Sequence, residues 1–275
     1  MTSPSLQQIK NQQAAWAASD PTRQVVRGYT PAVTDNLFPG ALSALTRSDF
    51  EAGDGGELGT KGQRPTKMCA LRSSSALAVN FFSPWRTTDL APLMQALGMD
   101  GRGLSMAFEY RPTGYPVPPR RPNLDLRIWG PDGTDIGIES KFCEPYDAHT
   151  AKRISPRYFP KGKCLWGDRG LEKAEELARR CEPRWTYLDV PQLLKHMLGL
   201  AYASEGAPTL LYLWFDTGLE DARGHREEVD RFARSVEGDR VRFASLSYQE
   251  LFGRISPAAE PAAGWHAYMA ARYFG

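Results

Sequence analysis

The chain is poor in the features that mark membrane-bound, secreted and disulfide-stabilised proteins. Its 275 residues include four cysteines, which are scattered and form no Cys-x-x-Cys pair. This usage favours a reducing compartment over a disulfide scaffold. No run approaches the ~18 apolar residues of a membrane helix, and the N-terminal sequence lacks the apolar stretch of a secretory signal. These absences predict a cytoplasmic protein that does not enter a membrane.

An excess of charge of one sign is also missing. Lys and Arg total 34 and Asp and Glu total 32, so the net charge is +2. The whole-chain charge therefore gives no reason to expect nucleic acid or a membrane surface as partner, and any basic surface must be local. Hydrophobic residues make up 41% of the chain and charged residues 24%, a balance that argues against disorder. A chain of this length buries a sufficient core without disulfides or structural metals.

One alternative use for the thiols is a zinc site. Its ligands would be Cys143, His149, Cys164 and Cys181. Their spacings match no known zinc module, so buried free thiols are the simpler interpretation.

Short segments in which apolar and polar residues alternate predict β-strands in the middle of the chain. These segments are 104–110, 124–129 and 136–142. The turn sequence Gly130-Pro131-Asp132-Gly133 joins the last two into a hairpin. A continuous apolar run at 209–215 predicts a strand buried on both faces, and 240–246 alternates again.

Helices are predicted around these strands from capping residues and apolar periodicity. Their ranges are 1–20, 73–83, 89–97, 171–182, 189–203, 221–237, 247–255 and 263–273, with loops at 51–67 and 147–170. This order predicts an α/β fold with a mixed central sheet flanked by helices. We expect one domain over residues 1–275, with a helical and loop extension (1–72), a core (73–215) and a C-terminal strand with helices (216–275).

Charged side chains gather on one face of the predicted hairpin. Glu139 and Lys141 are two residues apart and therefore project to the same face. The hairpin register can bring Asp125 beside Glu139. Two adjacent carboxylates repel, and one takes up a proton unless a cation lies between them. Mg²⁺ accepts such oxygens and retains water ligands, so the pattern predicts a magnesium site.

Lys141 beside such a site can lower the pKa of a bound water or stabilise charge on a pentavalent phosphate. The pattern therefore suits phosphodiester hydrolysis. Two simpler interpretations stay open. Glu139 and Lys141 can form a surface ion pair worth ~0–1 kcal/mol, and Asp125 can be a solvated strand charge.

The arrangement resembles the PD-(D/E)XK nuclease superfamily, whose restriction-endonuclease-like core has the order helix, three strands, helix, strand. It is most similar to a branch of bacterial restriction endonucleases with F-E, N-x-D and E-x-K-x-x-E on successive strands. The matching segments are Phe108-Glu109, Asn123-Leu124-Asp125 and Glu139-Ser140-Lys141-Phe142-Cys143-Glu144. The resemblance covers about residues 75–215. Leu124 replaces the motif's proline, and the literal Pro131-Asp132 pair lies in the hairpin turn, too close to Glu139 to oppose it.

The resemblance implies roles for these residues. Asp125 and Glu139 would hold Mg²⁺, or Mn²⁺ as a substitute, with the carbonyl of Ser140, and Lys141 would position or activate water. Glu109 is either a third carboxylate near the metal or a solvated residue. Several branches also carry a Gln or Lys on the helix after the hairpin, where Gln192 lies; an ordinary helix-surface glutamine is the alternative, and we expect the nearby His196 to be a packed histidine.

Basic residues concentrate in the loop after the hairpin, interleaved with aromatic residues. This pattern predicts phosphate contacts by the cations and base stacking by Trp166 or Tyr158. The cations are Lys152, Arg153, Arg157, Lys161 and Lys163. A second basic set, Arg111, Arg120 and Arg121, precedes Asp125. The alternative is a pair of solvated loops that never meet nucleic acid.

The sequence thus predicts a Mg²⁺-dependent nuclease, with double-stranded DNA as the substrate that the resemblance favours. Cleavage of both strands by chains with one site each would call for a homodimer. One alternative is a DNA-binding module that kept the fold and lost catalysis. Another is a small-molecule phosphohydrolase, against which the sequence shows no P-loop, no G-x-S-x-G and no histidine-rich cluster.

Overall fold

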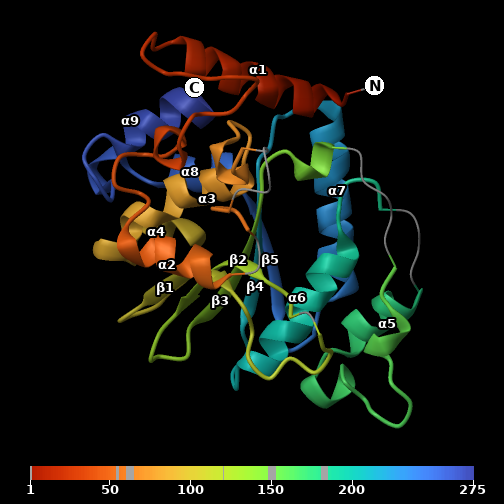
Figure 1. Cartoon of the computed structure of the whole chain (residues 1–275). Helices are drawn as coiled ribbons and strands as arrows, with labels where there is room; N and C mark the ends of the chain where they lie inside the picture. The colour runs from red at the N-terminus through yellow and green to blue at the C-terminus, as the bar shows by residue number, and fades with distance from the viewer. Residues whose placement is uncertain (1, 54–55, 60–64, 120, 148–152, 181–184) are drawn as a thin grey trace.

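A five-stranded mixed sheet forms the centre of the protein in the computed structural model (Figure 1). The structure describes all residues except 1, 54–55, 60–64, 120, 148–152 and 181–184. The strands follow the order β1 (Ser105–Tyr110), β2 (Leu124–Trp129), β3 (Asp135–Lys141), β4 (Thr209–Trp214) and β5 (Arg242–Ser247). The first three are antiparallel, and β3, β4 and β5 are parallel. The predicted α/β class with a mixed central sheet is confirmed.

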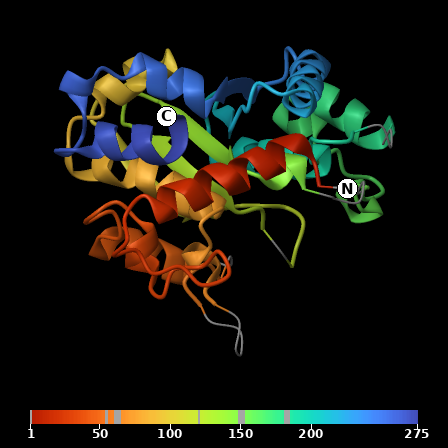
Figure 2. The ribbon, with the colours of Figure 1, turned by 90° about the horizontal axis from the view of Figure 1, so that it is seen from above.

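Helices cover both faces of this sheet. Figure 1 shows α6 and α7 on one side and α3, α4 and α8 on the other, and both views show α1 running past the C-terminal end of the chain (Figures 1 and 2). The helices are α1 (Pro4–Ala18), α2 (Ala44–Ala52), α3 (Ser74–Phe82), α4 (Ala91–Leu97), α5 (Glu172–Arg180), α6 (Val190–Ala203), α7 (Glu220–Ser235), α8 (Tyr248–Arg254) and α9 (Trp265–Met269). No helix of the described residues is both long and apolar enough to cross a membrane.

Strand pairing determines which residues share the face covered by α6 and α7. Glu139 lies opposite Tyr212 of β4, and the hydroxyl of Tyr212 is 3.0 Å from Nε2 of His225 on α7. Ser140 points the other way, where its hydroxyl lies 2.7 Å from the hydroxyl of Tyr248 on α8. Alternation along β3 therefore directs Glu139 and Lys141 toward α6 and α7.

Helix α2 was not predicted, because only Thr46 and Phe50 of its nine residues are buried. Ser43 caps it, and Phe50 stacks on Phe108 of β1 with ring centroids 5.6 Å apart. Asp49 accepts a hydrogen bond of 2.9 Å from the backbone N–H of Phe108. The helix therefore fixes β1, the strand that carries Glu109.

Gly199 of α6 packs against the proline-rich loop that joins β1 to β2. A Cβ atom at this position would lie 2.8 Å from Pro122 Cγ and 2.9 Å from Pro112 Cγ, both in rigid rings. In contrast, a Cβ at Gly253 of α8 would meet nothing within 4 Å.

We expect Gly199→Ala to lower the free energy of unfolding by about 1–2 kcal/mol, because overpacking outweighs the better helix propensity of alanine. The matched variant Gly253→Ala should leave this free energy unchanged or raise it by up to about 1 kcal/mol. Urea denaturation followed by circular dichroism measures both. An equal change in the free energy of unfolding for the two variants would contradict close packing between α6 and the proline-rich loop.

Candidate active site

The carboxylate of Glu139 lies at the centre of a buried cluster on the α6 side of the sheet. Lys141 Nζ is 2.5 Å from its Oε1, and His196 Nε2 of α6 is 3.1 Å from its Oε2. The side chains of Glu139 and His196 are each 2% exposed, and that of Lys141 is 15% exposed. The interpretation of Glu139 and Lys141 as a surface ion pair is therefore wrong.

These neighbours keep Glu139 ionised in spite of its burial. Burial alone raises the pKa of a carboxyl group, but here the charge of Lys141 and the contact with His196 outweigh burial and lower the pKa of Glu139 to about 2. Burial has the opposite effect on an amine and by itself lowers the pKa of Lys141. The nearby carboxylates of Glu139, Asp125 and Glu144 outweigh burial and raise this pKa. At neutral pH, Lys141 is an ammonium group that can donate hydrogen bonds.

Asp125 of β2 joins the cluster through the backbone of β3. Its Oδ2 accepts a hydrogen bond of 2.7 Å from the N–H of Ser140. Leu126 pairs with Ile138, so the same register places Asp125 opposite Glu139. Burial, followed by repulsion from Glu139, raises the pKa of Asp125 well above its usual value, although Lys141 and the Ser140 N–H oppose this shift. The half-buried Asp125 is thus not a freely solvated strand charge.

The carbonyl of Ser140 faces the same side of β3 as Asp125. The Lys141 carbonyl accepts the N–H of Phe215, just after β4, at 2.9 Å. Backbone groups alternate between the two edges of a strand, so those of Ser140 face β2. The hydrogen bond from the Ser140 N–H to Asp125 agrees with this orientation. Two carboxylates and one carbonyl therefore converge where β2 and β3 separate.

Glu109 lies next to this cluster in a strained conformation. Its φ is +50°, which is rare for a residue other than glycine, and its side chain accepts a hydrogen bond from Asn123 Nδ2. Glu109 is only 8% exposed, so the solvated interpretation is wrong. A Cβ atom at Gly53 would approach Glu109 Cβ to 2.8 Å, so the end of α2 fits here only without a side chain. Burial raises the pKa of Glu109 to about 7, and nearby Glu57 and Glu139 add to this shift.

His196 belongs to the buried cluster, which the sequence did not reveal. It is packed, as expected, but its packing partner is Glu139. Its Nδ1 has no hydrogen-bond partner among the described residues. Gln192 lies one helical turn earlier on α6 and is half-buried, and its backbone N–H is held by the Asp189 side chain at 3.0 Å. The signal in the sequence was the spacing of four residues, which places Gln192 and His196 on one face of the helix.

The predicted base-stacking residues are not available for stacking. Trp166 is 1% exposed and Tyr158 is 4% exposed, because the loop folds onto α6 and both rings join the main hydrophobic core. Trp166 Nε1 donates to the Tyr158 carbonyl at 3.0 Å, and its ring stacks on Phe159. The prediction that Trp166 or Tyr158 stacks on a base is therefore wrong, because both rings are buried.

The basic side chains of the loop remain at the surface. Arg153, Arg157, Lys161 and Lys163 are exposed, and Lys152 lies outside the described residues. The Tyr115 hydroxyl donates to the Tyr158 hydroxyl at 2.9 Å. This contact joins the loop to the proline-rich loop that runs from Glu109 to Asp125, so the two basic loops meet beside the strands of the site.

The donor set fits a hard divalent cation. Within the described part of the chain, no three His, Cys, Asp or Glu side chains gather closely enough to hold a metal by themselves. Magnesium does not need three, because it binds one or two carboxylates and completes its shell with carbonyl oxygens and water. Asp125, Glu139 and the Ser140 carbonyl supply such a set, and repulsion between the two carboxylates favours a cation between them. Of the four residues considered for the alternative zinc site, Cys143 and Cys164 form no such group, and His149 and Cys181 lie outside the described residues.

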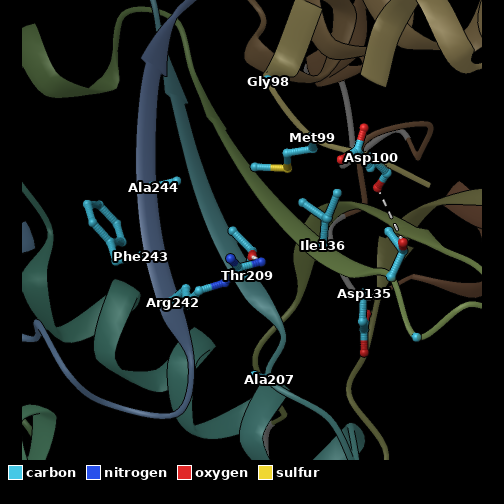
Figure 3. A pocket seen from close by; sticks show the side chains of 12 residues that line it. Gly98, Met99, Asp100, Asp135, Ile136, Ala207, Thr209, Arg242, Phe243 and Ala244 are labelled. Carbon is cyan, nitrogen blue, oxygen red and sulfur yellow. Dashed lines mark hydrogen bonds between the residues drawn. The ribbon is translucent and has the colours of Figure 1, made fainter. Parts of the chain in front are cut away.

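A separate cavity of about 520 Å³ lies at the opposite end of the parallel strands (Figure 3). Ile136, Thr209 and Ala244 line it, near the beginning of their strands. Lys141 is five residues beyond Ile136, roughly 16 Å along the strand. Asp135, which also lines this cavity, is held by Arg127 at 2.7 Å. The cavity contains none of the candidate catalytic residues.

The five-stranded mixed sheet flanked by helices is the fold of a restriction-endonuclease-like protein. The chain belongs to the family described as "Restriction Endonuclease associating with ARP", whose model matches residues 9–274. The family indicates a nuclease-type function with nucleic acid as the substrate class. Searches of curated proteins and of solved structures found no match.

The raised pKa of Glu109 predicts a pH dependence of stability. The pKa of Glu109 is about 7 in the folded protein and 4.5 in the unfolded chain. The contribution of Glu109 to the free energy of unfolding is therefore fully present below pH 4.5 and is lost as the pH rises through 7. In metal-free buffer, we expect this loss to be roughly 3 kcal/mol in the wild type and to be absent from Glu109→Gln, whose side chain does not ionise. Urea denaturation at pH 5 and pH 8 in EDTA compares the two proteins. A constant difference between them at both pH values would contradict the buried, protonated carboxyl group.

Proposed function

We propose that the protein is a metal-dependent endonuclease that hydrolyses double-stranded DNA, with Mg²⁺ as cofactor and Mn²⁺ as a substitute. The observation that carries this proposal is the contact network of Asp125, Glu139 and Lys141 around the separation of β2 and β3. A catalytically inactive DNA-binding protein would not need an ammonium group, an ionised carboxylate and a repelled carboxylate in one buried cluster. Burying such charges is costly unless they act together.

Asp125, Glu139 and the carbonyl of Ser140 would hold the cation. When bound, the cation supplies Lewis acidity at a phosphate oxygen and offsets the repulsion between the two carboxylates. Glu109 lies close enough to Glu139 for their charges to interact, so it would orient water or add a further ligand. The hydrogen bond of Ser140 to Asp125 fixes the position of both groups before any ligand arrives.

Lys141 would position the attacking water and stabilise the charge that develops on the phosphate. Its ammonium carries three donors, one of which bonds Glu139 at 2.5 Å. The other donors can point toward the scissile group, where a fixed positive charge stabilises the transition state. In-line attack would leave 5′-phosphate and 3′-hydroxyl ends, as the family resemblance implies. Gln192, in the first turn of α6, would contact the substrate.

The exposed cations of the loop after β3 would hold the DNA backbone. They are Arg153, Arg157, Lys161 and Lys163, with Lys152 beside them in the sequence. The Tyr115–Tyr158 hydrogen bond ties this loop to the loop entering β2, so a duplex crossing the site would meet both. Cleavage of both strands by one site per chain would use a homodimer. The division into 1–72, 73–215 and 216–275 stays a prediction.

We expect Glu139→Ala and Lys141→Ala each to abolish cleavage and to leave DNA binding within about threefold, because both groups act mainly in the transition state. A plasmid-nicking assay with Mg²⁺ or EDTA measures cleavage, and fluorescence anisotropy measures binding. The exposed Glu237→Gln serves as a control. Cleavage by either Ala variant at the wild-type rate would refute the mechanism. Binding by the wild type without any cleavage in Mg²⁺ or Mn²⁺ would favour the inactive DNA-binding module.

Lys161 and Lys163 provide a test of the binding surface. Each phosphate contact contributes ~0.9 to the slope of log K against log salt on duplex DNA. Replacing both with alanine should therefore reduce the slope by up to about 1.8 and weaken binding similarly for different sequences, without moving the cut position. Exposed Arg234 of α7, changed to alanine, is the matched control. An unchanged slope in the double variant would remove this loop from the binding surface.

A further inference from the structure

A second cluster of cations lines a cavity of about 290 Å³ between α1 and the segments around residues 28 and 71. Three basic residues, Lys10, Arg27 and Arg72, are among the residues that line it. The remaining lining residues are Gln13, Ala14, Gly28, Tyr29, Ala70 and Leu71, so no described residue of the wall is acidic. Three like charges around one concave surface repel each other unless an anion lies between them.

Arg27 is held in this wall by a strained turn. Val26 and Tyr29 exchange backbone hydrogen bonds of 2.9 and 3.0 Å, and the two residues between them have positive φ, +54° for Arg27 and +81° for Gly28. Such a two-residue turn favours asparagine or glycine at its first position. An arginine there is unfavourable for the fold alone, and such strain is often found at functional sites.

A fourth cation lies directly behind the wall. Arg272 is fully buried, and two wall residues bind its guanidinium: Gln13 Oε1 at 3.1 Å and the Leu71 carbonyl at 3.3 Å. The other hydrogen-bond partners of its guanidinium, Asn36 and Tyr268, are also neutral. The positive charge of Arg272 is therefore not neutralised by a carboxylate among its described partners, and it adds to the positive potential of the cavity.

The protein itself does little to neutralise the wall. Lys10 and Arg27 form no ion pair within the described part of the chain. Arg72 lies 4.0 Å from Asp147, but both side chains are exposed, at 44% and 58%. Such an exposed contact contributes little and does not compete with a ligand.

We propose that this cavity binds a phosphate group. Guanidinium groups offer planar pairs of donors that match phosphate oxygens, and the volume exceeds that of one phosphate group. The phosphate can belong to a nucleic-acid backbone or to a free nucleotide. We favour the nucleic-acid backbone, because the cavity lies close to the strand that carries Lys141. The thiol of Cys143, two residues beyond Lys141, contacts the carbonyl of Arg72 at 3.5 Å. The phosphate site itself does not rest on the proposed nuclease activity.

The test uses the full-length protein in EDTA, so that no cleavage is measured. Inorganic phosphate is titrated at constant ionic strength against chloride while the melting temperature is recorded. The wild type should gain stability as it binds phosphate. Arg27→Asn should bind phosphate about tenfold more weakly. It should fold at least as well as the wild type, since asparagine suits the turn. Arg27→Lys, which keeps the charge, and Arg234→Asn, which removes an exposed charge from α7, are the controls.

A second arm identifies the source of the phosphate. If it is a DNA backbone, Arg27→Asn should reduce the salt slope of duplex binding by ~0.9. If it is a free nucleotide, binding of 5′-AMP should fall about tenfold while duplex binding stays the same. Either result supports the site. The same phosphate dependence in the wild type, Arg27→Asn and Arg234→Asn, or no stabilisation of the wild type by phosphate, would overturn it.

Discussion

The arrangement of the site depends on keeping the buried carboxylate of Glu139 ionised. An isolated carboxylate at this depth would take up a proton. Lys141 supplies a charge from the same strand, and His196 supplies a contact from α6, so strand alternation and helix packing must both be correct. Asp125 is then left close to a negative charge that Lys141 only partly offsets. A divalent cation placed between the two carboxylates relieves this repulsion, which links the fold to the proposed chemistry.

Backbone strain and close contacts support this cluster and the phosphate cavity. Among the described residues, the non-glycine residues with positive φ are Glu109 and Arg27. One lies next to the candidate cation site and the other in the wall of the phosphate cavity. Gly53 leaves space for Glu109, and Gly28 completes the turn of Arg27. In each case the chain holds an ionisable side chain in a backbone conformation that the fold alone does not favour.

The strands and the face shared by Glu139 and Lys141 could be predicted because a period of two residues is a local property of the sequence. The position of Asp125 opposite Glu139 followed from the hairpin turn. His196 could not be assigned to the site, since its contact with Glu139 depends on how α6 packs on the sheet. The prediction for Trp166 was wrong for a similar reason. The polar composition of its loop indicated a solvent-exposed segment, but the loop folds onto α6 and buries the Trp166 ring. Helix α2 was missed because it has little apolar periodicity.

The central claim is that Asp125 and Glu139 together hold a divalent cation. Electron paramagnetic resonance of Mn²⁺ titrated into the purified protein tests this claim without DNA and without cleavage. The account predicts saturable binding by the wild type and a loss of at least about tenfold in affinity in Asp125→Ala, which removes one of two carboxylate ligands. Equal Mn²⁺ binding by the wild type and Asp125→Ala would contradict it.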